Sequence, residues 1–417
     1  MNAQSPIGFS YDPYAREVLD NPLPYYRELL ENHPGYYVEK YDMFVFTRFQ
    51  DIIDVLGVTE DNTFVGSEST LPMPAAITHK NDGAPPLPST NPMGPGIMLP
   101  SPEYEEMRIA HMKPLRPKAV AAIQDMVHDL AMERLRALLP RGKFDVMSEY
   151  CGLISAAVTC HLLGIPKSEA QGVLDAVNEL AVYSDDKEGV DTPGMFDQLK
   201  SYILPAVERR RKAGADGEVP MIDGLINHHV KRDGRSLTDN EIADQLVCAF
   251  VAATETPPKP TSQGLWTLWR HPDQLAEIRK DLDTNIPIVT EEILRLCITN
   301  QFAIRTAHKD VTVAGVDIKA GQRVLAAVYA GLRDPREFDK PEEFIWNRDI
   351  KRVLTFGYGQ HHCIGNNLAR MQIRVMLKTF LEHVQDFEFD MDEAVHAASY
   401  FHWGWIKLPV VIKQYSI

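Results

Sequence analysis

The sequence predicts a mainly α-helical protein with small peripheral β-sheets. Apolar residues recur with helical periodicity from residue 103 to about residue 300, most clearly over 119–139 and 144–166. A strand, a turn and a second strand are predicted over 310–328, and a last long helix over 364–384. No internal repeat interrupts this pattern. We therefore expect residues 1–417 to form a single domain.

The N-terminal part is predicted to be richer in β-structure, over about residues 1–75. Residues 36–58 mix aromatic and β-branched residues before an apolar-periodic tail, which predicts a short hairpin followed by a helix. Residues 83–102 are dense in proline and glycine, which predicts a long irregular loop. A loop of this length in a compact domain is usually functional or disordered.

Composition and charge exclude some classes of function. The chain is 44% hydrophobic and 24% charged, which is ordinary for a globular protein with a large core. Its formal net charge of −15 disfavours nucleic acid as a partner. The first 20 residues lack the apolar core of a signal peptide, and no run of about 18 apolar residues predicts a membrane span. We expect a cytoplasmic protein.

One of the five cysteines stands apart from the others. The number is odd and no C-x-x-C pair occurs, which disfavours a disulfide framework or a zinc ribbon. Cys363 lies in FGYGQHHCIG, where Gly357 and Gly359 let the backbone adopt positive φ or approach a flat surface. A thiolate just before the last helix would face backbone N–H groups and the helix dipole, and both lower its pKa. The sequence thus predicts a loop suited to an anionic sulfur.

The loop by itself is also compatible with two other interpretations. Cys363 could be a buried cysteine in a glycine-rich turn, or a zinc ligand together with His361 and His362. Adjacent residues rarely converge on one metal ion, and no second pair of ligands stands nearby in the sequence. The spacing of the whole segment decides between these hypotheses. It resembles the haem-binding signature of the bacterial soluble cytochrome P450 family, F-G-x-G-x-H-x-C-x-G, at Phe356, Gly357, Gly359, His361, Cys363 and Gly365.

The resemblance implies the cytochrome P450 fold and a haem b whose iron is bound by Cys363. The haem would lie between a long central helix and the helix of the cysteine loop, against Phe356, Gly357 and Gly365. Glu292 and Arg295 match the family's E-x-x-R, and Arg348 resembles the third member of that structural ion-pair network. The looser resemblance of 101–120, 161–166 and the C-terminal segment extends the similarity over essentially the whole chain.

Haem carries two propionates, which need cationic or hydrogen-bonding partners. The resemblance offers Arg108, Arg305 and His361 for this role. Tyr104 occupies the place where many relatives carry a histidine, four residues before that first arginine. A phenol donates a hydrogen bond but carries no charge at neutral pH.

The segment 246–266 resembles the family's central helix, and Ala252 to Thr256 resemble its oxygen-activating motif. The resemblance implies that Thr256 holds dioxygen and an ordered water while Glu255 supplies protons. Three prolines follow and cannot donate backbone hydrogen bonds to the carbonyls four residues earlier. A broken or widened turn is therefore predicted over 254–260, its carbonyls bonded to water. It would reshape the proton-delivery groove or only redirect the second half of the helix. The prolines are Pro257, Pro258 and Pro260.

The reaction implied by the resemblance is monooxygenation, the hydroxylation or epoxidation of a small-to-medium apolar substrate with O2. Two electrons would come from a soluble acidic ferredoxin and its NAD(P)H-dependent reductase, because the chain has no flavin or iron–sulfur motif. A basic patch on the cysteine face would attract such a partner. Its expected members are Lys113, Arg116, Lys118, Lys351, Arg352, Arg370 and Arg374.

The substrate pocket is expected to combine loops with the central helix. Its predicted lining is 83–101, the stretch near 180–198, Ala252, Phe302, Ala303, Ile304, and 400–403 with Phe401 and Trp403. His402 could bond a polar group of the substrate. We expect a monomer. Alternative functions on the same scaffold are a peroxide-driven peroxygenase, a nitric oxide reductase and a non-catalytic haem sensor.

Overall fold

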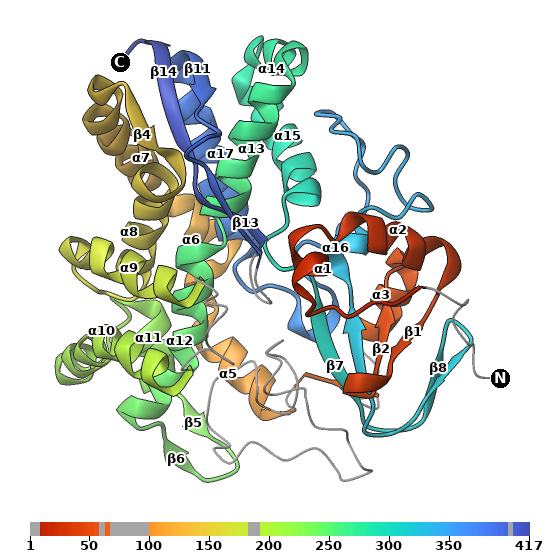
Figure 1. Cartoon of the computed structure of the whole chain (residues 1–417). Coiled ribbons are helices and arrows are strands. Elements are labelled where there is room, and N and C mark those ends of the chain that lie inside the picture. Colours follow the sequence, from red (N-terminus) through yellow and green to blue (C-terminus); the bar gives the residue numbers. More distant parts are fainter. Residues whose placement is uncertain (1–8, 58–62, 67–98, 100, 182–191, 399–402) are drawn as a thin grey trace.

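A computed structural model describes residues 9–57, 63–66, 99, 101–181, 192–398 and 403–417, without side chains for 180–196. Helices make up one side of the molecule, and a smaller β-rich part lies beside them (Figure 1). Each part has its own apolar core. The predicted class, mainly α with small sheets, is confirmed. Within the described residues, no helix is long and apolar enough to cross a membrane.

The β-rich part is built from two distant stretches of the chain. The predicted hairpin and helix over 36–58 are confirmed as β1, β2 and α3. The expected N-terminal region also begins with two helices, so it is less purely β than predicted. The N-terminal elements are α1 (Arg16–Asp20), α2 (Leu23–Asn32), β1 (Tyr36–Val38), β2 (Met43–Phe46), α3 (Phe49–Leu56) and β3 (Phe64–Val65).

The largest sheet joins these strands to later ones in the order β1-β2-β10-β7-β3. Its later strands are β7 (Ala303–Ala307) and β10 (Arg323–Ala326), and β10 pairs with β2 in parallel. The region predicted as strand, turn and strand contains a third strand, because β8 (Val311–Val313) and β9 (Val316–Ile318) form their own hairpin before β10. The short helix α16 (Val328–Gly331) follows. Arg305 thus lies on β7, inside the sheet and opposite Val324.

The helical part is made of two successive runs of helices along the chain. The first helices are α5 (Glu103–His111), α6 (Pro117–Ala122), α7 (Gln124–Leu138), α8 (Leu153–Leu162), α9 (Ala170–Ala181), α10 (Thr192–Ala213) and α11 (Pro220–Ile226). The later ones are α12 (Asp239–Glu255), α13 (Pro258–Arg270), α14 (Pro272–Arg279), α15 (Leu282–Leu296) and α17 (Asn366–His383). The helix predicted over 144–166 begins instead with β4 (Lys143–Asp145) and a π-helical turn, Val146–Gly152.

Two helices carry the segments with chemical motifs. α12 begins with a capping box, in which Thr238 and Glu241 satisfy each other's backbone N–H groups. α17 begins directly after the cysteine loop and buries one apolar face against α7 and α15. The remaining strands are β5 (His229–Val230), β6 (Arg235–Ser236), β11 (Val384–Phe389), β12 (Val395–Ala398), β13 (Trp403–Lys407) and β14 (Pro409–Tyr415).

Candidate haem site

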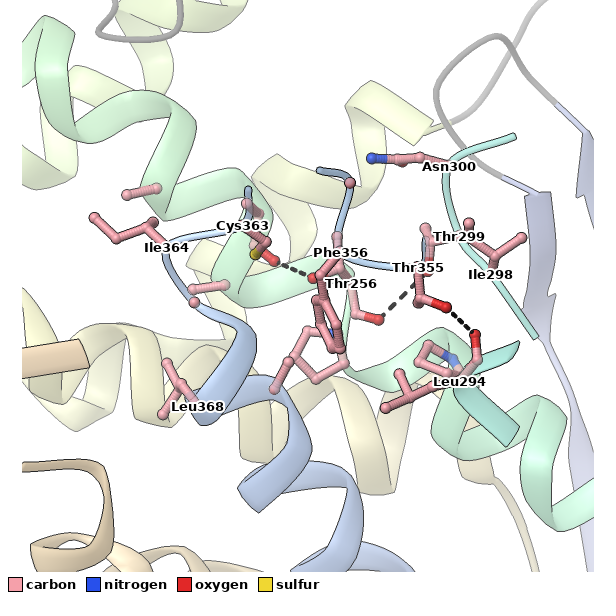
Figure 2. Close-up of a pocket in the computed structure, with 18 of the residues that line it drawn as sticks. Thr256, Leu294, Ile298, Thr299, Asn300, Thr355, Phe356, Cys363, Ile364 and Leu368 are labelled. Atoms are coloured by element: carbon pink, nitrogen blue, oxygen red, sulfur yellow. Dashed lines mark hydrogen bonds between the residues drawn. The ribbon is translucent and has the colours of Figure 1, made fainter. Parts of the chain in front are cut away.

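A cavity of about 330 Å³ lies where α12, the cysteine loop and the chain after α15 meet. Figure 2 shows Cys363, Phe356 and Thr256 around it, with Leu294 from the end of α15 and Thr299 from the segment between α15 and β7. The structure therefore brings the two predicted motifs, more than 100 residues apart in the sequence, to one site. The predicted site residues that line the cavity are Ala252, Thr256, Phe302, Ala303, Arg305, Phe356, Gly357, His361, Cys363 and Gly365.

The cysteine loop is held by backbone contacts that only glycine allows. Gly357 and Gly359 both have φ of +68°, in the left-handed region. A Cβ on Gly359 would lie 2.1 Å from the carbonyl oxygen of Leu56, at the end of α3. The Cys363 N–H donates to the Phe356 carbonyl at 2.8 Å, and the side chain of Asn366 donates to the Cys363 carbonyl at 2.8 Å. The loop is thus fixed on both sides of the sulfur.

The electrostatics of Cys363 differ from the expectation. Burial raises the pKa of its thiol, while the Gly365 N–H and the charges of Arg108 and Arg370 lower it, and the net direction is upward. The predicted lowering by the N–H groups at the start of the helix is present, through Gly365, but burial is the larger effect and the pKa of the thiol is raised in the chain by itself. Desolvation outweighs one N–H donor and two more distant cations. The zinc hypothesis finds no support either, since no metal-binding group of three or more His, Cys, Asp or Glu occurs in the described chain.

The residues predicted to bind propionates form one cationic cluster. Arg108 donates to the Tyr104 hydroxyl at 3.0 Å and to the His362 carbonyl at 2.5 Å. The rings of Tyr104 and His361 lie 4.2 Å apart. Burial lowers the pKa of Arg305 to about 10, and burial with the nearby arginines lowers the pKa of His361 to about 3. No described carboxylate forms an ion pair with Arg108 or Arg305. A buried cluster of this kind fits an anionic ligand group.

The predicted ion-pair network is present with all three members. Arg295 donates to both carboxylate oxygens of Glu292, at 2.7 and 2.9 Å, and Arg348 Nε contacts both at 3.1 Å. Arg295 also donates to the carbonyls of Leu332 and Pro341, at 2.8 and 2.7 Å. Glu292 and Arg295 are 0% exposed. The network therefore anchors α15 to the chain that leads into the cysteine loop.

The predicted interruption of the central helix is confirmed. α12 ends at Glu255 and α13 begins at Pro258, although Thr256 and Pro257 keep right-handed helical φ and ψ. The Thr256 N–H still donates to the Ala252 carbonyl at 3.2 Å, and the Thr261 N–H donates to the Pro257 carbonyl at 3.3 Å. The break therefore lies in the hydrogen bonding and not in the direction of the chain. The Thr256 carbonyl, expected to bond water, accepts from the Thr299 hydroxyl at 3.5 Å. The Thr256 hydroxyl donates to the Ala252 carbonyl at 2.6 Å.

Glu255 and Thr256, the acid and the alcohol of the predicted oxygen-activating motif, differ in their access to the cavity. Thr256 lines the cavity, whereas Glu255 does not and is 1% exposed. The carboxylate of Glu255 pairs with Lys259, one turn further along and 2% exposed. Sequence analysis did not single out Lys259. The signal that could have found it is a lysine four residues after an acid in a segment that is otherwise apolar.

The remaining pocket predictions have mixed outcomes. Ile304 and Trp403 do not line the cavity, and Trp403 instead packs against Tyr329 and His396, with ring centroids 5.2 and 4.5 Å away. Its strand reaches the site through the backbone, because the Trp403 N–H donates to the Thr299 carbonyl at 2.9 Å. Phe401, His402 and nearly all of 83–101 lie outside the described residues, as do the side chains of 180–196. The lining by Ile298, Thr299 and Asn300 was not predicted.

Comparison with known proteins agrees with this geometry. Residues 159–415 match the model of the cytochrome P450 family. The chain belongs to the cytochrome P450 family. It is 28% identical over 318 residues to pentalenic acid synthase of Streptomyces avermitilis, covering 74% of this chain and 75% of that protein. It is 28% identical over 330 residues to a methyl-branched lipid omega-hydroxylase of Mycobacterium bovis, covering 76% of this chain and 74% of that protein.

Solved P450 structures share the whole fold. P450BioI, crystallised with an acyl carrier protein bearing hexadec-9Z-enoic acid, superposes with a TM-score of 0.80 at 23% identity, over 95% of this chain and 99% of that one. CYP109Q5 from Chondromyces apiculatus gives 0.80 at 25% identity, over 97% and 98%. This P450 is an oxidoreductase of the monooxygenase class, and its cofactor is a haem with cysteine thiolate ligation. The cavity, the Cys363 loop and the Arg108–Arg305 cluster fit that cofactor.

Proposed function

We propose that this P450 hydroxylates or epoxidises a small-to-medium apolar substrate, using O2 and two electrons from a ferredoxin system. The observation that carries the proposal is Thr256 in the wall of the cavity that Cys363 also lines. Around Thr256 the wall is mostly apolar, with Ala252, Ile298 and Phe302, which suits a substrate without charge. The relatives named as a methyl-branched lipid omega-hydroxylase and a pentalenic acid synthase agree with a lipid-like or terpenoid substrate.

The haem, when bound through the Cys363 thiolate, supplies the activation of dioxygen. The chain supplies the rest. Arg108, Arg305 and Tyr104 would hold the propionates, because they form the cationic and hydrogen-bonding cluster at one side of the cavity. The Thr256 hydroxyl donates its hydrogen bond to the Ala252 carbonyl, so its lone pairs remain to accept a hydrogen bond from a water in the cavity. Thr256 would thereby hold that water in place. Glu255 would supply a new proton to the water after the water has given one up.

The cysteine face offers a narrower basic patch than the sequence suggested. Arg352 pairs with Glu337, Lys351 with Asp349, and both Arg370 and Arg374 with Glu291. Lys113, Arg116 and Lys118 are exposed and form no ion pair with any described residue. Ile109 on α5 and Tyr358 in the cysteine loop are exposed large side chains, at 65% and 44%. We propose these five residues as the contact for an acidic ferredoxin.

The test is turnover by the haem-loaded enzyme with a ferredoxin and its reductase, and separately with hydrogen peroxide. Products are followed with a panel of lipid and terpenoid substrates chosen by their ligand-induced spectral shifts. We expect ferredoxin-driven product, lowered in yield per electron by Thr256→Ala. Replacing Lys113, Arg116 and Lys118 by glutamate reverses their charge and should raise the KM for ferredoxin. The same replacement of Lys212, on α10, should not. Turnover with peroxide alone would favour the peroxygenase, and full coupling in Thr256→Ala would refute the role of Thr256.

A further inference from the structure

A buried ion pair spans the interruption of the central helix, next to the cavity. Glu255 is the last residue of α12, and Lys259 lies in the first turn of α13. Their carboxylate and ammonium are in contact, and the side chains are 1% and 3% exposed. Ala252, Thr256 and Pro260 line the cavity, whereas Glu255 and Lys259 do not. The pair therefore occupies the flank of the helix next to the cavity face.

The prolines explain why a cation is needed here. Pro257, Pro258 and Pro260 have no N–H, so three carbonyls of the preceding turn lose their helical donors and the next helix begins with few free N–H groups. The carbonyl ends that lack a helical donor give the break a negative electrostatic character. A buried carboxylate at the same place is unfavourable unless a cation compensates it. Lys259 is the residue of opposite charge in contact with Glu255.

The aliphatic part of the Lys259 side chain lies against the C-terminal hairpin, which is formed by β12 and β13. Its Cβ, Cγ and Cδ lie 3.6–3.7 Å from the position that a Cβ on Gly404 would take. Gly404 is on β13, opposite Ala397 of β12, and α13 packs against β13. The neighbouring His396 has a pKa lowered to about 4, by burial first and also by Lys259, while Asp20 opposes this. His396 is therefore neutral at pH 7 and adds no second cation. Burial lowers the pKa of Lys259 itself, and Glu255 opposes that shift.

We propose that Lys259 is the positioning residue for Glu255, holding its carboxylate ionised on the hairpin side of the helix break. The inference deepens the proposed function and, for its catalytic consequence, rests on the role of Glu255 given there. A proton passes from the Lys259 ammonium to a Glu255 carboxylate oxygen, and from Glu255 to the water at Thr256. Lys259, neutral after the transfer, regains a proton from solvent, so each transfer is balanced. Without Lys259, any proton lost by Glu255 would leave a buried carboxylate that lacks the ammonium now in contact with it.

Infrared difference spectra of the ferric, haem-loaded enzyme read the ionisation of Glu255 directly. The wild type minus Glu255→Gln difference should show a carboxylate at pH 7. In the Lys259→Met background the same difference should show the C=O stretch of a protonated carboxyl, and Lys259→Arg should restore the carboxylate. Lys200→Met is the matched control, because Lys200 pairs with Asp244 on α12 and is not in contact with Glu255. A protonated Glu255 in the wild type, or a carboxylate in Lys259→Met, would overturn the proposal.

A second measurement separates this inference from the proposed function. Product formed per electron should fall about tenfold or more in Lys259→Met, with a larger solvent deuterium effect, and recover in Lys259→Arg. Circular dichroism and the carbon monoxide difference spectrum check that each variant is folded and holds haem. If Glu255→Gln leaves coupling unchanged while the infrared result holds, the proposed role of Glu255 fails and the ion-pair assignment stands. If coupling depends on Glu255 but not on Lys259, the positioning role of Lys259 is wrong.

Discussion

Replacing Glu292 by glutamine should cost this P450 more stability than the loss of an exposed ion pair does. Glu292 is fully buried and accepts from Arg295 Nε and Nη2 at 2.7 and 2.9 Å and from Arg348 Nε at 3.1 Å. Glutamine keeps the shape but leaves the buried guanidinium of Arg295 without a negative partner. Burial already lowers the pKa of Arg295, and Glu292 is the charge that opposes this. Breaking such a pair costs about 3–5 kcal/mol.

The assay is the free energy of unfolding of the haem-loaded enzyme in urea, followed by circular dichroism. Glu342→Gln is the control, because Glu342 pairs with Arg27 where the side chains are 39% and 58% exposed, and should cost about 0–1 kcal/mol. Arg295→Met should cost less in the Glu292→Gln background than alone, because the charge is already unpaired there. A loss in Glu292→Gln no larger than in Glu342→Gln would refute the assignment of a stabilising network.

Three further predictions follow from the site and its supports. Arg305→Leu should lower haem retention in dialysis against apomyoglobin, whereas Lys309→Leu, beyond the same strand, should not; equal retention would contradict the propionate role of Arg305. Gly359→Ala should lower the yield of haem-loaded protein, since its Cβ would lie 2.1 Å from a backbone oxygen, while Gly315→Ala, which shares the positive φ but has open space around it, should lower the yield less. Burial holds the pKa of His111 near 4 against 6.5 in the unfolded chain, so stability should fall by about 3 kcal/mol from pH 6.5 to 4, because the unfolded chain binds the extra proton. His111→Gln should flatten that part of the profile, and an unchanged profile would show that His111 is not the group responsible.

Local sequence was sufficient for the cysteine loop. Gly357, Gly359 and Cys363 lie within seven residues, and the backbone they require follows from covalent constraints and from the absence of a Cβ. The same holds for the break after Glu255, because proline lacks the N–H that a continuous helix needs. The pairing of Glu292 with Arg295 was also predictable, since residues three apart meet on a helix surface.

Only the tertiary structure decided which side chains reach the cavity. Trp403 was expected in its wall but packs against Tyr329 and His396, because the course of β13 is set by its pairing with β12. The basic patch is narrower than expected for a similar reason, since Glu291 on α15 pairs with both Arg370 and Arg374 on α17 and offsets one of their two charges. Such contacts join distant segments, and no local periodicity records them.

The sequence by itself determined the haem-thiolate class of this protein, because the ligand and the glycines that expose it are neighbours in the chain. It also determined that the central helix is interrupted. The tertiary structure decided the environment of Glu255: the i,i+4 spacing places Lys259 against its carboxylate, and the packing of α13 on β13 helps to bury both side chains. Desolvation and charge pairing depend on everything packed around a group, so its chemical role is decided only when the chain has folded.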